Sequence, residues 1–130
     1  MKKKIKICIV RSKYNQTTQL LKSATDELIK RKILYKILEI PGAFEIPVVI
    51  SKNINNYDGF IALGSIIKGE TPNFTFISSA ITNGLIHLSI LYKKPIGNAV
   101  LTCLNEKQAR SRSNKGYEAA VAVSEVINAK

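Results

Sequence analysis

Apolar residues occur along the chain in two alternating patterns, short continuous runs and stripes at three- to four-residue spacing. Continuous runs are typical of strands that are buried on both faces. They lie at residues 6–10, 33–40, 57–64 and 96–104. Stripes are typical of helices with one buried face. They lie at residues 17–31, 44–55 and 72–92.

The segment after the last predicted strand carries a helix start signal. Asn105 and Gln108 have the spacing of a capping box, in which side chains bond the free backbone N–H groups of the first turn. We expect helix from here to the C-terminus, with an interruption around 113–116. Strands that alternate with helices over residues 1–130 predict one α/β domain, in which a four-stranded parallel sheet is covered by helices on both faces.

The formal net charge of +11 comes mostly from lysines that are spread along the chain. No basic stripe with interleaved aromatic residues is present, so we expect no nucleic-acid partner. The basic start is followed by an apolar stretch shorter than that of a secretory signal. The longest apolar runs, such as 60–67, are too short to span a bilayer. We therefore expect a cytoplasmic protein without a membrane partner.

Two cysteines and one histidine are the residues that would most readily bind a transition metal. Cys8 and Cys103 lie within predicted strands, and His87 has no cysteine near it in the sequence. Metal sites need more ligands at closer spacing. We expect two buried free thiols and no metal site.

The segment after the third predicted strand has the sequence of an anion-binding turn. Gly64 and Gly69 flank it, and Thr71 and Pro72 are suited to the N-cap and first position of the next helix. Such a turn presents backbone N–H groups to a phosphate. Glu70 occupies the position of the lysine in a nucleotide-binding P-loop, which disfavours an NTPase. A plain strand–turn–helix connection is the structural alternative.

Five motifs are distributed along the chain between residues 9 and 120. They are IVRSKYNQ at 9–16, PGAFEIP at 41–47, ALGSIIKGETP at 62–72, AVLTCLNEKQARSR at 99–112 and NKGYEAA at 114–120. In this order and at this spacing they resemble the lumazine synthase family. The resemblance implies a flavodoxin-like three-layer sandwich around the four-stranded parallel sheet.

The family condenses 5-amino-6-(D-ribitylamino)uracil with 3,4-dihydroxy-2-butanone 4-phosphate to 6,7-dimethyl-8-ribityllumazine, an intermediate of riboflavin biosynthesis. The resemblance therefore implies a transferase with two small-molecule substrates and no cofactor. Family members assemble as pentamers or multiples of pentamers, with sites shared between neighbouring subunits. A homo-oligomer is implied here as well.

Individual residues match the family's two substrate sites. Those that match the ribitylaminouracil site are Tyr14, Ala43, Phe44, Glu45, Ser65, Ile66, Ile67 and Asn98. Those that match the butanone phosphate site are Glu70, Thr71, Arg112 and Lys115. Tyr14 stands where the family stacks an aromatic ring on the pyrimidine, and Arg112 where an arginine pairs with the phosphate. A solvated helix face is the alternative for Arg112 and Lys115.

The position of the family's catalytic histidine is Asn73 in this chain. The asparagine side chain does not act as a general acid or base at physiological pH, so a contribution of about 10²- to 10⁴-fold from general acid–base catalysis is lost. His87 lies roughly 20 Å further along the same predicted helix and cannot replace it. The resemblance then predicts a slow synthase that acts mainly by holding its reactants together.

Two further departures affect the same pocket. Asn98 stands where the family usually has an aromatic residue, and the segment between Arg112 and Asn114 is shorter than in the family. The alternative function is a non-catalytic subunit of the same fold, which binds ribityl-pyrimidines or flavins or serves in assembly.

Overall fold

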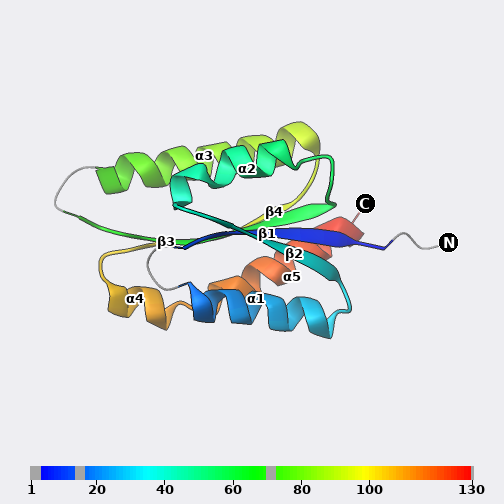
Figure 1. The fold of residues 1–130 in the computed structure, drawn as a ribbon, viewed down its shortest axis with the longest axis horizontal. Coiled ribbons are helices and arrows are strands. Elements are labelled where there is room, and N and C mark those ends of the chain that lie inside the picture. Colours follow the sequence, from blue (N-terminus) through cyan, green and yellow to red (C-terminus); the bar gives the residue numbers. More distant parts are fainter. Residues whose placement is uncertain (1–3, 14–16, 70–72, 130) are drawn as a thin grey trace.

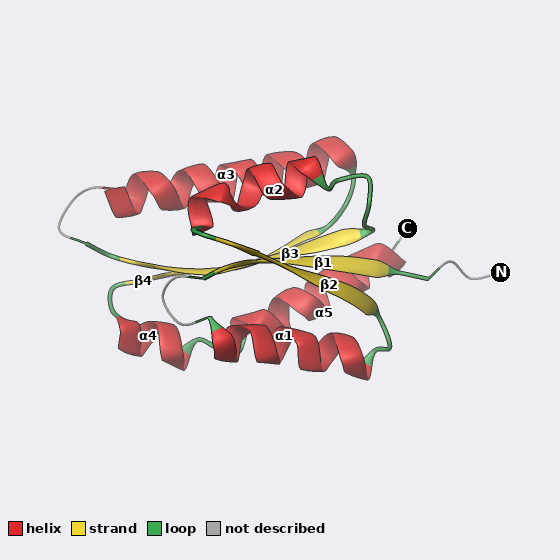
Figure 2. Ribbon diagram, in the orientation of Figure 1, coloured by secondary structure: helices red, strands yellow, loops and turns green. Residues whose placement is uncertain are grey.

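The computed structural model describes residues 4–13, 17–69 and 73–129. A four-stranded parallel sheet in the order β2–β1–β3–β4 lies between two layers of helices (Figure 1, Figure 2). The strands are β1 (Lys6–Ser12), β2 (Leu34–Ile40), β3 (Gly59–Ile67) and β4 (Ile96–Cys103). The helices are α1 (Thr18–Lys30), η1 (Ala43–Glu45), α2 (Ile46–Lys52), α3 (Asn73–Tyr92), α4 (Glu106–Ser111) and α5 (Lys115–Asn128). The predicted flavodoxin-like three-layer fold is confirmed.

Each face of the sheet carries its own hydrophobic core. Helices α2 and α3 cover one face, and α1, α4 and α5 cover the other (Figure 1). Successive residues of the central strands point to opposite faces, so that Ile7 and Ile9 face α1 and α5 while Cys8 and Val10 face α2 and α3. Both sets are buried. This is why the central strands are continuous apolar runs in the sequence.

The helix predicted over 44–55 is partly wrong. Ala43–Glu45 form a separate 3₁₀ turn, η1, and α2 covers only Ile46–Lys52. Pro47 lies in the first turn of α2, where its missing N–H costs nothing, so the α-helix begins next to it. The residues before it adopt the tighter turn.

The capping signal at Asn105 is confirmed, as is the interruption near the C-terminus. The backbone N–H of Gln108 donates to Asn105 Oδ1 at 2.9 Å, and Gln108 Oε1 accepts from the N–H of Leu104 at 2.8 Å. Helix α4 ends at Ser111 and α5 begins at Lys115. There α5 lies so close to α1 that a Cβ on Gly116 would be 2.0 Å from a backbone oxygen of α1, which only glycine permits.

Helix α3 corrects the expectation that no apolar segment is long enough to span a bilayer. Its 20 residues satisfy that criterion by length and composition, although polar side chains interrupt every continuous apolar run. Only 11% of the apolar window is buried, and the exposed side chains include Phe76, Ile86, Ile90 and Leu91. Length and composition do not distinguish a membrane span from a helix that contacts other protein. The outer face of α3 is therefore a large apolar surface available for contact.

The two cysteines are buried and free, as predicted. Cys8 is fully buried in β1. Burial raises the pKa of its thiol from 9.0 to about 11, although the nearby Lys36 and Lys6 act in the opposite direction. The folded state therefore holds the Cys8 proton more tightly than the unfolded state does. The resulting contribution to the free energy of unfolding is fully present below pH 9 and is lost as the pH rises towards 11.

We therefore predict that the free energy of unfolding falls by roughly 1–3 kcal/mol more in the wild-type protein than in a Cys8→Ala variant between pH 9 and pH 11. Urea titrations of both proteins at several pH values across this range measure the free energy of unfolding. Comparing its slope against pH in the two proteins removes the constant cost of the smaller side chain. Equal dependence of the free energy of unfolding on pH in the two proteins would show that Cys8 does not titrate with a raised pKa.

Candidate active site

The carboxyl ends of all four strands meet at one edge of the sheet, where ligands bind in folds of this class. Two backbone hydrogen bonds hold this edge together beyond the strands. The N–H of Lys13 donates to the carbonyl of Ile40 at 3.0 Å, and that of Lys68 donates to the carbonyl of Cys103 at 2.9 Å. The chain segments that leave the strands therefore start from fixed positions.

Three of the predicted site residues, Tyr14, Glu70 and Thr71, lie outside the residues that the structure describes. The pyrimidine-stacking aromatic and the phosphate turn stay predictions. Asn73 is the first residue of α3 and is exposed. His87 is exposed on the same helix, roughly 20 Å away at 1.5 Å per residue, which agrees with the expectation that it does not replace the missing histidine.

The turn η1 forms one wall of a mostly apolar pocket. Ala43 and Glu45 are half-buried, whereas 61% of the surface of Phe44 is exposed. A pocket of about 390 Å³ is lined by Phe44, Glu45, Pro47, Val48, Ala80 and Ile81. Among the described residues that line it, Glu45 supplies the one carboxylate. This combination suits a ligand with an apolar ring and hydrogen-bond donors such as hydroxyl groups.

The end of β3 contributes Ser65, which is buried, and Ile66 and Ile67, which are half-buried. Next to them Gly64 packs closely against β1, because a Cβ there would lie 2.6 Å from Ser12 Oγ and force that hydroxyl to move. Ser12 is 1% exposed, and its hydroxyl has no hydrogen-bond partner among the described residues. Sequence reasoning missed this contact. The available signal was a polar residue at the end of a buried strand.

The remaining predicted residues lie around α4, α5 and β4. Arg112 follows α4, and its Nη1 lies 3.8 Å from Cys103 Sγ. Lys115 begins α5, with its Nζ 3.8 Å from Glu118 Oε2. Asn98 Oδ1 accepts a hydrogen bond from the N–H of Val100, two residues along the same strand.

The structure brings the predicted residues together in two groups rather than one. Ala43–Glu45 pack with α2 and α3 on one face of the sheet, and Arg112 and Lys115 belong to the helical layer on the other (Figure 1). The pocket beside Phe44 includes neither of these basic residues. Within the described residues of a single chain, the two predicted substrate sites therefore do not form one cavity.

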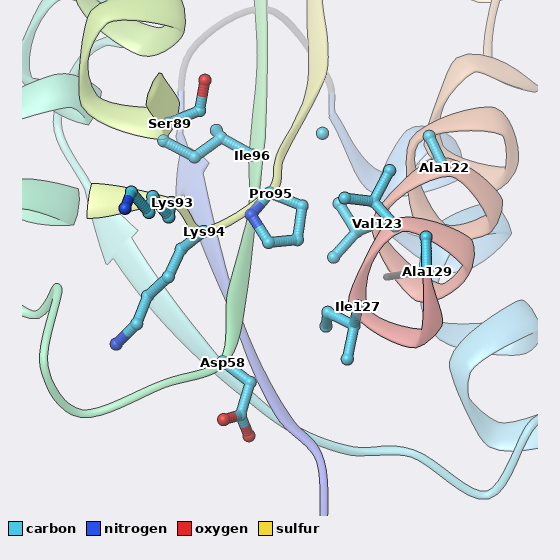
Figure 3. A pocket seen from close by; sticks show the side chains of 12 residues that line it. Asp58, Ser89, Lys93, Lys94, Pro95, Ile96, Ala122, Val123, Ile127 and Ala129 are labelled. Atoms are coloured by element: carbon cyan, nitrogen blue, oxygen red, sulfur yellow. The ribbon is translucent and has the colours of Figure 1, made fainter. Parts of the chain in front are cut away.

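A larger pocket, of about 670 Å³, lies at the opposite edge of the sheet, near the start of β4 (Figure 3). Its walls come from the ends of α3 and α5, with Lys93, Lys94 and Asp58 among the lining residues. None of the predicted active-site residues that the structure describes lines it. Ligands in parallel sheets bind at the carboxyl edge, and this pocket lies at the other edge, which also argues against it as the active site.

Fold and site together define a flavodoxin-like α/β protein with its candidate site at the carboxyl edge of the sheet. A family model described as 6,7-dimethyl-8-ribityllumazine synthase matches residues 4–130. Proteins of that name from Campylobacter curvus, Helicobacter hepaticus and Cutibacterium acnes are 33%, 34% and 34% identical to this chain. The alignments cover 96%, 95% and 96% of this chain and 88%, 86% and 81% of the relatives. The chain therefore belongs to the 6,7-dimethyl-8-ribityllumazine synthase family, transferases of riboflavin biosynthesis.

The contact between Ser12 and Gly64 is testable by a double-mutant cycle. Gly64→Ala should destabilise the protein by about 1–3 kcal/mol, because the new methyl group overlaps the Ser12 hydroxyl. Ser12→Ala removes an unpartnered buried hydroxyl and should cost less than about 1 kcal/mol. The double variant should regain most of the loss, as measured by urea unfolding. Strict additivity would contradict the contact.

Proposed function

We propose that this protein condenses 5-amino-6-(D-ribitylamino)uracil with 3,4-dihydroxy-2-butanone 4-phosphate to 6,7-dimethyl-8-ribityllumazine, without a cofactor. The observation that carries the proposal is a family match over residues 4–130 combined with the pocket beside η1, at the carboxyl edge of the sheet. We further propose that residues 1–130 act as one domain and that the protein works in the cytoplasm.

In this proposal the turn η1 and the end of β3 bind the ribitylaminouracil. The exposed Phe44 and the side chains of α2 and α3 offer apolar surface, and the half-buried carboxylate of Glu45 accepts hydrogen bonds from ribityl hydroxyls. Tyr14 stacks on the pyrimidine ring. The backbone at Ser65, Ile66 and Ile67 lines the ring edge.

The second substrate is held through its phosphate. Backbone N–H groups of the turn at Glu70 and Thr71 face the phosphate at the start of α3, where the helix dipole favours an anion. The guanidinium of Arg112 matches phosphate geometry through two parallel N–H donors. Lys115 adds positive charge. Arg112 has no ion pair with a carboxylate among the described residues, whereas Arg110 lies 3.7 Å from Glu106.

The chemistry requires amine addition to a ketone, dehydration to an imine, elimination of phosphate and ring closure. Asn73 cannot move the protons that these steps require. Its amide can orient a water molecule or the carbonyl group by hydrogen bonding. Catalysis then comes mainly from holding two reactive molecules in a productive arrangement, and turnover is slow.

The active form in this proposal is a homo-oligomer, a pentamer or a multiple of it, whose neighbouring chains share each site. Two features support this. The predicted substrate residues lie on opposite faces of the sheet, so that one chain does not close a cavity around both substrates. Helix α3 also exposes Phe76, Ile86 and Ile90, and a neighbouring copy would cover this apolar surface.

A steady-state assay of lumazine formation from both substrates tests the function. The wild-type protein should exceed the uncatalysed rate, and Asn73→His should raise kcat by about tenfold or more, because an imidazole restores proton transfer. Asn55→His, at an exposed position in the turn after α2, is the matched control and should leave kcat unchanged.

A non-catalytic binding subunit is the second candidate. It is favoured by the asparagines at positions 73 and 98, where the family has its catalytic histidine and usually an aromatic residue. It predicts saturable binding of a ribityl-pyrimidine, measured by isothermal titration calorimetry, with no turnover. Background rates for both the wild-type protein and Asn73→His would exclude the synthase, and saturable binding in the same protein would then establish this alternative.

A further inference from the structure

Cys103 connects two parts of the carboxyl edge that are separate in the sequence. It is the last residue of β4, and its side chain is 1% exposed. Its carbonyl accepts the N–H of Lys68 at 2.9 Å, which fixes the end of β4 against the segment leaving β3. Its Sγ lies 3.8 Å from Nη1 of Arg112. The thiol is therefore a fixed point against which this guanidinium rests.

The backbone of Arg112 is held on both sides. Its N–H donates to the carbonyl of Ala109 at 3.2 Å, and its carbonyl accepts from the N–H of Lys115 at 3.0 Å. At the other end of α4, the hydrogen bonds of Gln108 fix the turn that follows Cys103. These backbone bonds leave the direction of the long Arg112 side chain open, and its guanidinium contacts Cys103 Sγ.

We propose that Cys103 is a positioning residue that directs the guanidinium of Arg112 towards the phosphate of the substrate. The proposal rests on the proposed function. A thiol suits this task because it is a weak, uncharged acceptor that occupies one of five guanidinium N–H donors. The other donors stay available for a bidentate contact with phosphate, and the positive charge is not neutralised.

The role is tested by kinetics of Cys103→Ala, with Cys8→Ala as the matched control, because Cys8 is a second buried thiol facing the opposite core. Cys103→Ala should raise KM for the butanone phosphate by about three- to tenfold and leave KM for the ribitylaminouracil unchanged. Cys103→Ser, which keeps an acceptor, should restore most of the loss. Cys8→Ala should change neither KM.

A double-mutant cycle separates positioning from a general effect on the fold. In an Arg112→Ala background, Cys103→Ala should have no further effect on KM for the phosphate substrate, since the side chain that it directs is gone. Independent, multiplicative effects of the two substitutions would overturn the proposal. An equal rise of both KM values in Cys103→Ala, without rescue by serine, would also overturn it.

Binding of inorganic phosphate distinguishes this proposal from the proposed function. If the wild-type protein forms no lumazine, the synthase function fails, but calorimetric titration with phosphate still measures the arginine site. Weaker binding by Cys103→Ala than by the wild-type protein, with binding by Cys8→Ala unchanged, supports the positioning role. Equal affinities, or no phosphate binding by the wild-type protein, contradict it.

Discussion

The parallel pairing of four strands is the constraint on which the rest of the structure depends. It buries both faces of β1 and β3, and it places every strand's carboxyl end at the same edge. Backbone hydrogen bonds from Lys13 and Lys68 extend the pairing beyond the strands. Residues that are distant in the sequence therefore leave the sheet close together, which is the geometry that a two-substrate site requires.

The same layered architecture limits what one chain achieves alone. The pocket beside Phe44 and Glu45 opens on the α2–α3 side, and Arg112 belongs to the α4–α5 side. The sheet lies between them. In the proposed homo-oligomer, a second copy presents its basic face to this pocket, and the exposed apolar side of α3 offers a surface for that contact.

The fold was predictable because its determinants are local patterns. Continuous apolar runs gave four strands, and the capping pair at Asn105 and Gln108 located the start of α4. The 3₁₀ turn at Ala43–Glu45 was missed because its residues suit either kind of helix. The length of apolar surface on α3 was missed because scattered polar residues interrupt it. The contacts of Ser12 with Gly64 and of Cys103 with Arg112 depend on tertiary packing, which no sequence pattern records.

Subunit mixing tests the shared site most directly. A Glu45→Ala variant and an Arg112→Ala variant each remove a substrate-binding group from a different half of the site, so each should lose most of its activity alone. After the two are unfolded and refolded together, random assembly should give about one quarter of the sites an intact half from each neighbour, with about that fraction of wild-type turnover. Turnover no higher than that of the two variants refolded separately would contradict a site built from neighbouring copies.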